Sequence, residues 1–138
     1  TGSVYAKAAE YRYIALREDA TTGNAASFDL STGTVVATSG CTASISSVGN
    51  GWYRCTLSVT SNTDLNRHAI YKIADANGSS YATANGTSGV YVWGAQLEAL
   101  AYPTSYIPTT SATVTRAVDG HARPGLTLAL EELACEAE

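Results

Sequence analysis

The 138-residue chain contains no methionine, one phenylalanine, three prolines and only 14% charged residues. With 45% hydrophobic residues, this composition fits a globular domain and excludes a solvated polyelectrolyte. The net charge is −4 and no basic cluster occurs, so we do not expect nucleic acid as a partner. No apolar run approaches the roughly 18 residues of a membrane-spanning helix, which excludes membrane insertion, and nothing resembles a signal peptide. Because position 1 is not methionine, we expect a piece of a longer protein.

Cysteine is also scarce. Cys41, Cys55 and Cys135 are odd in number and lack the spacing of a metal site. If the segments around Cys41 and Cys55 are strands, alternation points both side chains into one core. A disulfide between them and two buried free thiols are both compatible with this arrangement.

The dominant pattern is the alternation of apolar and polar residues that is typical of half-buried strands. In "GWYRCTLSVT", Tyr53 and Leu57 share one face, while Trp52 and Arg54 share the other. Phe28 has the same inward parity in "SFDL", so we expect Tyr53, Leu57 and Phe28 in the core. Eight strands are predicted, near residues 2–8, 11–18, 26–30, 34–38, 42–47, 52–60, 67–75 and 89–98.

Turn chemistry separates these segments, with Asn50-Gly51 as a predicted hairpin turn in which both residues adopt positive φ. Short strands at this spacing, with no helical period before residue 125, predict an all-β fold. We expect an antiparallel β-sandwich of about eight strands.

The C-terminal part breaks this pattern. "LTLALEELACEAE" places leucines on one helical stripe, so the sequence predicts a β-sandwich module over residues 1–119 and a helical or irregular connector over residues 120–138. Before it, Pro103 and Pro108 exclude a helix and favour an extended strap across the sandwich. Tyr106 and Ile107 are expected to anchor this strap.

Four blocks carry a resemblance to a known module: "FDLSTG", "GNGWYRC", "YVWGAQLEA" and "TSYIPT" followed by "VTRAVD". In this order they resemble a module of bacteriophage tail fibre and minor tail proteins, over about Val4 to Asp119. The resemblance implies a jelly-roll sandwich similar to carbohydrate-binding modules and lectin-like domains. It also implies that the protein is made in the bacterial host cytoplasm and becomes part of the virion. Its implied partners are other virion proteins and, within a fibre, further copies of itself.

Three functions fit this resemblance, because such modules serve both as glycan binders and as virion architecture. The favoured prediction is a non-catalytic carbohydrate-binding module that contacts a host surface polysaccharide or glycan. The alternative is a purely structural or decoration module. A more distant alternative is a binding module appended to a polysaccharide-degrading enzyme.

Trp52 and Arg54 are the predicted ligand-binding residues, because they project away from the apolar face of their strand. An exposed tryptophan can stack on a sugar ring, and a guanidinium can bind hydroxyls or a carboxylate. Gln96 and Glu98 are predicted as their polar partners in the ligand site. In the structural alternative, Gln96 and Glu98 tie the last strand to the strap, and Trp52 and Arg54 lie beneath a loop with Arg54 paired to Glu98. Tyr91 and Trp93 share parity with Ala95 and Leu97, and are expected to point inward.

No catalytic signature surrounds His68 or His121, so we do not expect an enzyme. Asp29 and Glu98 are the acid pair that glycoside hydrolysis would require, but the sequence does not fix their separation. The segment "NTDLN" alternates oxygen ligands at residues 62, 64 and 66 but lacks the remainder of an EF-hand loop. No cofactor is predicted, and a structural calcium elsewhere in the sandwich stays open.

Overall fold

The computed structural model describes residues 1–18, 23–60, 69–72 and 85–108, with β7 described by its backbone alone. Each of the eight predicted strand ranges overlaps an observed strand. The strands are β1 (Gly2–Ala8), β2 (Tyr13–Glu18), β3 (Ala25–Asp29), β4 (Thr34–Ser39), β5 (Thr42–Gly49), β6 (Trp52–Ser58), β7 (Ala69–Lys72) and β8 (Val90–Leu97).

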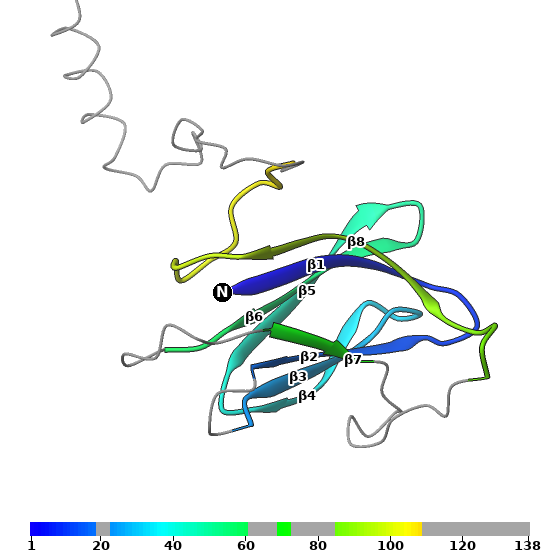
Figure 1. The fold of residues 1–138 in the computed structure, drawn as a ribbon, viewed down its shortest axis with the longest axis horizontal. Coiled ribbons are helices and arrows are strands. Elements are labelled where there is room, and N and C mark those ends of the chain that lie inside the picture. The colour runs from blue at the N-terminus through cyan, green and yellow to red at the C-terminus, as the bar shows by residue number, and fades with distance from the viewer. Residues whose placement is uncertain (19–22, 61–68, 73–84, 109–138) are drawn as a thin grey trace, which may run out of the picture. The chain divides into compact units, whose positions relative to one another are not determined.

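The strands form two four-stranded sheets, which lie as two layers in Figure 1. One sheet, the β1 sheet, has the order β5-β6-β1-β8, and the other, the β2 sheet, has the order β4-β3-β2-β7. Every neighbouring pair is antiparallel. The predicted all-β antiparallel sandwich is therefore confirmed. None of the described residues forms a helix that could cross a membrane.

The core lies between the inner faces of the two sheets. In the β2 sheet, Ile14 lies opposite Phe28, and both side chains are buried. In the β1 sheet, Val4 lies opposite the buried Cys55. The core cluster consists of Val4, Ala6, Ile14, Leu16, Ala26, Phe28, Leu30, Cys55 and Leu57. Alternation forms this core, because successive side chains of a strand project to opposite faces of its sheet.

The three predicted core residues are confirmed. Phe28 and Leu57 are fully enclosed, and Tyr53 is half-buried and packs against the core cluster. The predicted hairpin turn between β5 and β6 is also confirmed, because Asn50 and Gly51 adopt φ angles of 53° and 76°. Asn and Gly tolerate this left-handed backbone better than other residues do.

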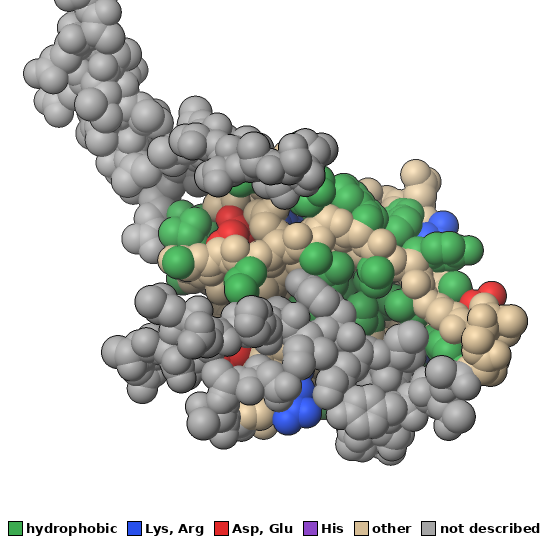
Figure 2. Space-filling view, in the orientation of Figure 1, with side chains coloured by type: hydrophobic (Ala, Val, Ile, Leu, Met, Phe, Trp, Pro, Cys, Tyr) green, Lys and Arg blue, Asp and Glu red, His purple; other side chains and the backbone are tan. Residues whose placement is uncertain are grey.

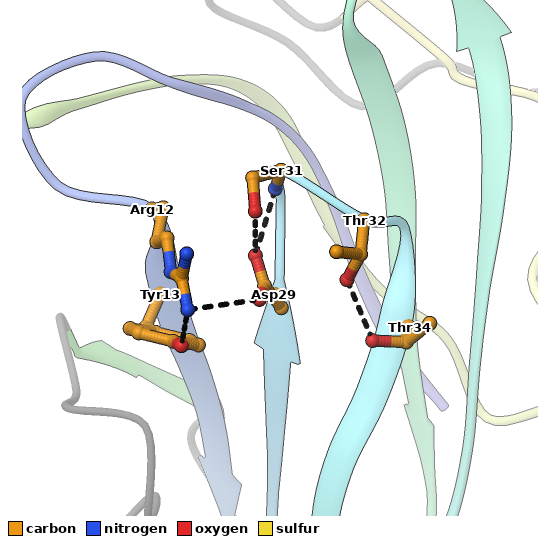
Figure 3. Close-up of polar contacts among 6 residues, drawn as sticks. All are labelled: Arg12, Tyr13, Asp29, Ser31, Thr32 and Thr34. Carbon is orange, nitrogen blue, oxygen red and sulfur yellow. Dashed lines mark hydrogen bonds and ion pairs between the residues drawn. The ribbon is translucent and has the colours of Figure 1, made fainter.

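Asp29 organises the turn between β3 and β4 (Figure 3). Its Oδ1 accepts hydrogen bonds from the Ser31 amide at 2.8 Å and from the Ser31 hydroxyl at 2.6 Å. Its Oδ2 lies 3.6 Å from Nη2 of Arg12, and its carbonyl accepts a hydrogen bond from the Gly33 amide. Burial alone would raise the pKa of Asp29, but the Ser31 hydrogen bonds and the Arg12 charge together lower it below its ordinary value.

We expect the stabilising contribution of Asp29 to this turn to be lost in acid. A carboxyl group whose folded-state pKa is depressed stabilises the fold above its unfolded-state pKa, near 3.8 for Asp29, and loses that contribution as pH falls through the folded-state pKa. Urea unfolding between pH 7 and pH 2 should show the free energy of unfolding decreasing through this window. The Asp29→Asn variant should be less stable at pH 7 and should have a flatter pH profile. An unchanged profile in the variant would contradict the role of this carboxylate.

The two described cysteines are free thiols. The register explains why they do not pair: Cys55 lies opposite Ile45, whereas Cys41 comes four residues earlier, just before β5 begins. Cys41 donates a hydrogen bond to the carbonyl of Ala25, at 3.2 Å. Burial raises the pKa of Cys55 to about 12, so its reactive thiolate is scarcely populated at neutral pH.

We therefore expect Cys55 to resist alkylation in the folded protein. In a Cys135→Ser background, denaturation without reductant should expose two alkylatable thiols, Cys41 and Cys55, whereas native protein at pH 7 should leave Cys55 unmodified. Peptide mapping by mass spectrometry distinguishes the two sites. If Cys41 and Cys55 in the denatured protein were alkylated only after reductant is added, they would form a disulfide, which would contradict this register.

Several predictions lie outside the described residues. They are the C-terminal helix, the boundary between residues 119 and 120, the candidate calcium ligands at residues 62, 64 and 66, His68 and His121.

Candidate functional site

The outer face of the β1 sheet, which points away from the β2 sheet, carries the candidate site. Tyr5 and Lys7 on β1 project to this face, because they alternate with Val4 and Ala6, whose side chains enter the core. The β1–β6 register places Tyr5 opposite Arg54 and Lys7 opposite Trp52. The sequence-based placement of Trp52 and Arg54 on this outer face is therefore confirmed.

The inward orientation predicted for Tyr91 and Trp93 is wrong. In the β1–β8 register, Trp93 lies opposite Tyr5 and Tyr91 lies opposite Lys7, so both share their outer face. The next pairing is Ser3 with Gln96, so β8 has one more residue than β1 over this interval. This extra residue forms a β-bulge around Gly94, which adopts a φ of +61°. The bulge reverses the side-chain alternation, and Trp93 and Gln96 consequently lie on the same face.

Five aromatic side chains form an aromatic platform on this face: Tyr5, Trp52, Tyr91, Trp93 and Tyr106. Trp93 is central to it and stacks on Tyr5, with ring centroids 4.4 Å apart and planes at 14°. Its ring meets Trp52 edge-on at 6.4 Å and Tyr106 edge-on at 5.2 Å. Tyr91 extends the platform from Trp52, at 6.5 Å. Such pairs hold the rings in fixed orientations.

The platform is accessible from solvent. Trp93 is 45% exposed and Tyr91 is 59% exposed, although large aromatic side chains are usually enclosed. Trp52, Tyr5 and Tyr106 are half-buried. Figure 2 shows hydrophobic side chains gathered along the margin of the layer that contains β1 and β8. An exposed aromatic group of this kind is typical of a binding surface.

A strap formed by residues 99–106 covers part of the same face, and it is the yellow segment on the outer side of β8 in Figure 1. Thr104 fastens it: its backbone amide donates to Oε2 of Glu98 at 3.0 Å, and its hydroxyl also donates to this carboxylate. Gln96 donates to the carbonyl of Ser105 at 3.4 Å. Arg54 donates through Nη2 to the Thr104 carbonyl and to Ser3.

The charge of Glu98 contributes to this fastening. Partial burial opposes ionisation, but hydrogen bonds from Thr104 and Gln96 and the positive charge of Arg54 lower the pKa of Glu98 below its ordinary value. Glu98 is therefore ionised at neutral pH and accepts the Thr104 hydrogen bonds as a carboxylate. These bonds are charge-assisted and stronger than those between neutral groups.

The four predicted ligand-binding residues thus separate into two groups. Trp52 belongs to the aromatic platform. Arg54, Gln96 and Glu98 hold the strap, which agrees with the structural alternative for them, although Arg54 acts on Glu98 through its charge while bonding to Thr104.

Sequence reasoning missed the contributions of Tyr5, Tyr91 and Trp93 to the platform. The signal that would have found them is the isolated glycine in "VYVWGAQL", because a glycine inside a strand often marks a bulge. Tyr106 was expected to anchor the strap, and it does so by contacting Trp93.

We expect Gly94→Ala to disturb the platform. A Cβ at this position would lie 2.9 Å from Cδ2 of Tyr5 and 3.3 Å from Cδ2 of Tyr106, and the left-handed backbone disfavours any side chain. The free energy of unfolding should fall by about 1–3 kcal/mol, and the aromatic circular dichroism should change. Gly89→Ala is the matched control, because a Cβ at Gly89 would meet no atom within 4 Å. Equal effects of the two substitutions would contradict the bulge.

The described residues contain no cluster of three or more His, Cys, Asp or Glu side chains that could hold a metal ion. Asp29 and Glu98 lie at the ends of strands in different sheets, and each accepts hydrogen bonds from its own turn or strap. Each carboxylate therefore has a local structural role, Asp29 in the β3–β4 turn and Glu98 in the strap.

No protein-family model matches the chain, and no curated protein sequence matches it significantly.

Proposed function

We propose that the chain is a non-catalytic carbohydrate-binding module of the jelly-roll type, carried by a phage tail fibre or another virion appendage. In this proposal, the aromatic platform contacts glycans of the host surface. The assignment to a virion rests on the resemblance of the four sequence blocks. The assignment to glycan binding rests on the platform.

The observation that carries the proposal is the outward, partly exposed position of Trp93, beside Trp52 and Tyr91. Sugar rings present C–H groups on one face and hydroxyls at their edges, so an aromatic surface with polar neighbours suits them. A structural module would instead be expected to enclose both tryptophans. The shallow face predicts weak affinity, about millimolar to micromolar, which multiple copies on a fibre would increase through avidity.

Two strand pairings support the jelly-roll type. β1 pairs with β8, and β2 pairs with β7, both antiparallel, so the end of the described strand series folds back onto its start. This nesting is expected of a chain that wraps around a sandwich. The short helix or connector expected over residues 120–138 remains part of the proposal.

One observation favours the structural alternative. The strap uses Arg54, Gln96 and Glu98 for internal hydrogen bonds, so three polar groups that a sugar would need are already engaged. A decoration module would use the strap to fix its surface for contact with other virion proteins. In this alternative, the aromatic platform would be a contact surface for those proteins.

A glycan array tests the proposal. The chain should be biotinylated and displayed in four copies on streptavidin, because avidity makes weak binding measurable. We expect a defined subset of bacterial surface glycans to retain the chain. If no glycan is retained by chain that is folded by circular dichroism, the carbohydrate proposal fails and the structural alternative takes its place.

A further inference from the structure

Lys7 places a positive charge beside the aromatic platform. It lies on β1 between Trp52 on β6 and Tyr91 on β8, and all three belong to the outer face of the β1 sheet. The end of the Lys7 side chain lies beside Gly51 in the β5–β6 turn. A Cβ placed on Gly51 would be 3.5 Å from Cε of Lys7 and 4.0 Å from its Nζ. The ammonium group is therefore close to the end of the platform that includes Trp52.

This ammonium group has no ion-pair partner among residues 1–18, 23–60 and 85–108: the Lys7 side chain makes no hydrogen bond or ion pair with any of them. Two other charged side chains of this region, Arg54 and Glu98, interact with each other through their charges. The strap thus engages the Arg54 and Glu98 side chains, whereas the Lys7 side chain forms no ion pair with a described residue. The chain as a whole is acidic, with a net charge of −4.

We infer that the platform binds an acidic saccharide, with the sugar ring against Trp93 and Trp52 and its carboxylate near Lys7. This inference rests on the proposed carbohydrate-binding function and specifies its ligand class. An ammonium group supplies three hydrogen-bond donors and no acceptor, so it favours carboxylates over neutral hydroxyls. A net-negative protein repels polyanions in general, and a local cation beside the platform overcomes this repulsion at one place.

The test compares acidic polysaccharides with their own methyl esters, which keep the sugar ring and remove the charge. Polygalacturonate, polymannuronate and hyaluronan serve as acidic probes beside the neutral glycans of the array. We expect the chain to prefer the acidic form of whichever backbone it binds, and this preference should weaken as salt increases.

Lys7→Gln should lower affinity for the acidic form about three- to tenfold and leave binding of the ester unchanged, because an exposed charge-assisted contact has an effect of this order. Arg12→Gln is the matched control: it removes one exposed positive charge from the residue just before β2 and should change neither affinity.

The outcomes separate the two proposals. The chain could bind neutral glycans or methyl esters as tightly as the acids, with no effect of Lys7→Gln. That result overturns the acidic-saccharide inference and leaves the carbohydrate-binding function intact. A folded chain that binds no member of either set overturns both.

Discussion

Replacing Leu57 with alanine will lower the free energy of unfolding by about 2–5 kcal/mol. Leu57 is 3% exposed and belongs to the core cluster between the two sheets. The substitution removes buried apolar surface and leaves a cavity, and the two effects add. Urea denaturation of both proteins, monitored by tryptophan fluorescence, measures the difference.

Leu97→Ala provides a matched control for this substitution. Gly2 lies opposite Leu57 on one side of β1 and opposite Leu97 on the other, yet Leu97 is 60% exposed. The same chemical change at Leu97 should therefore cost less than about 1 kcal/mol. Similar losses in the two variants would contradict the burial of Leu57 in the core.

Replacing Trp93 with alanine will reduce glycan affinity at least tenfold. Trp93 contacts three other members of the platform, so its removal deletes the central ring and releases Tyr5 and Tyr106 from their stacked and edge-on positions. Stacking of one aromatic group on a ligand contributes about 1–3 kcal/mol, as measured for bases, which is consistent with a loss of this size. Fluorescence or calorimetric titration with a glycan identified on the array measures the affinity.

The stability of this variant must be measured with its affinity. The free energy of unfolding should fall by only about 1–2 kcal/mol, because Trp93 is half-exposed and loses mainly its ring contacts. Tyr13→Ala is the aromatic control. Tyr13 belongs to the β2 sheet, so its replacement should leave binding unchanged. Unaltered affinity in a folded Trp93→Ala protein would exclude the platform as the binding site.

Most of the fold could be predicted from the sequence, because strand alternation and turn residues are local signals. Tyr53 and Leu57 alternate with Trp52 and Arg54, and the structure preserves this alternation because β6 pairs with β1 without a register shift. Asn50-Gly51 similarly determines its own turn through backbone preferences. The order of strands in the sheets could not be derived, since it depends on contacts between distant residues.

The candidate site was predicted only in part, for two reasons. The extra residue at the Gly94 bulge reverses the alternation of β8, so parity counted from Leu97 gives the wrong face for Trp93 and Tyr91. The use of Arg54 and Glu98 was also not decidable from spacing. Both act on Thr104, which is 50 residues from Arg54 in the chain, and this contact exists only once the strap lies across the sheet.

The indole signals of the two tryptophans provide the most direct test of the platform as a glycan site. The chain contains only Trp52 and Trp93, and both belong to the platform, so a ¹⁵N-labelled sample yields two indole N–H resonances that Trp52→Phe assigns. Titration with a saccharide from the array should shift both resonances progressively, with backbone shifts confined to β1, β6, β8 and the strap. Binding that leaves both indole resonances unmoved, or that shifts the β2 sheet instead, would contradict the account.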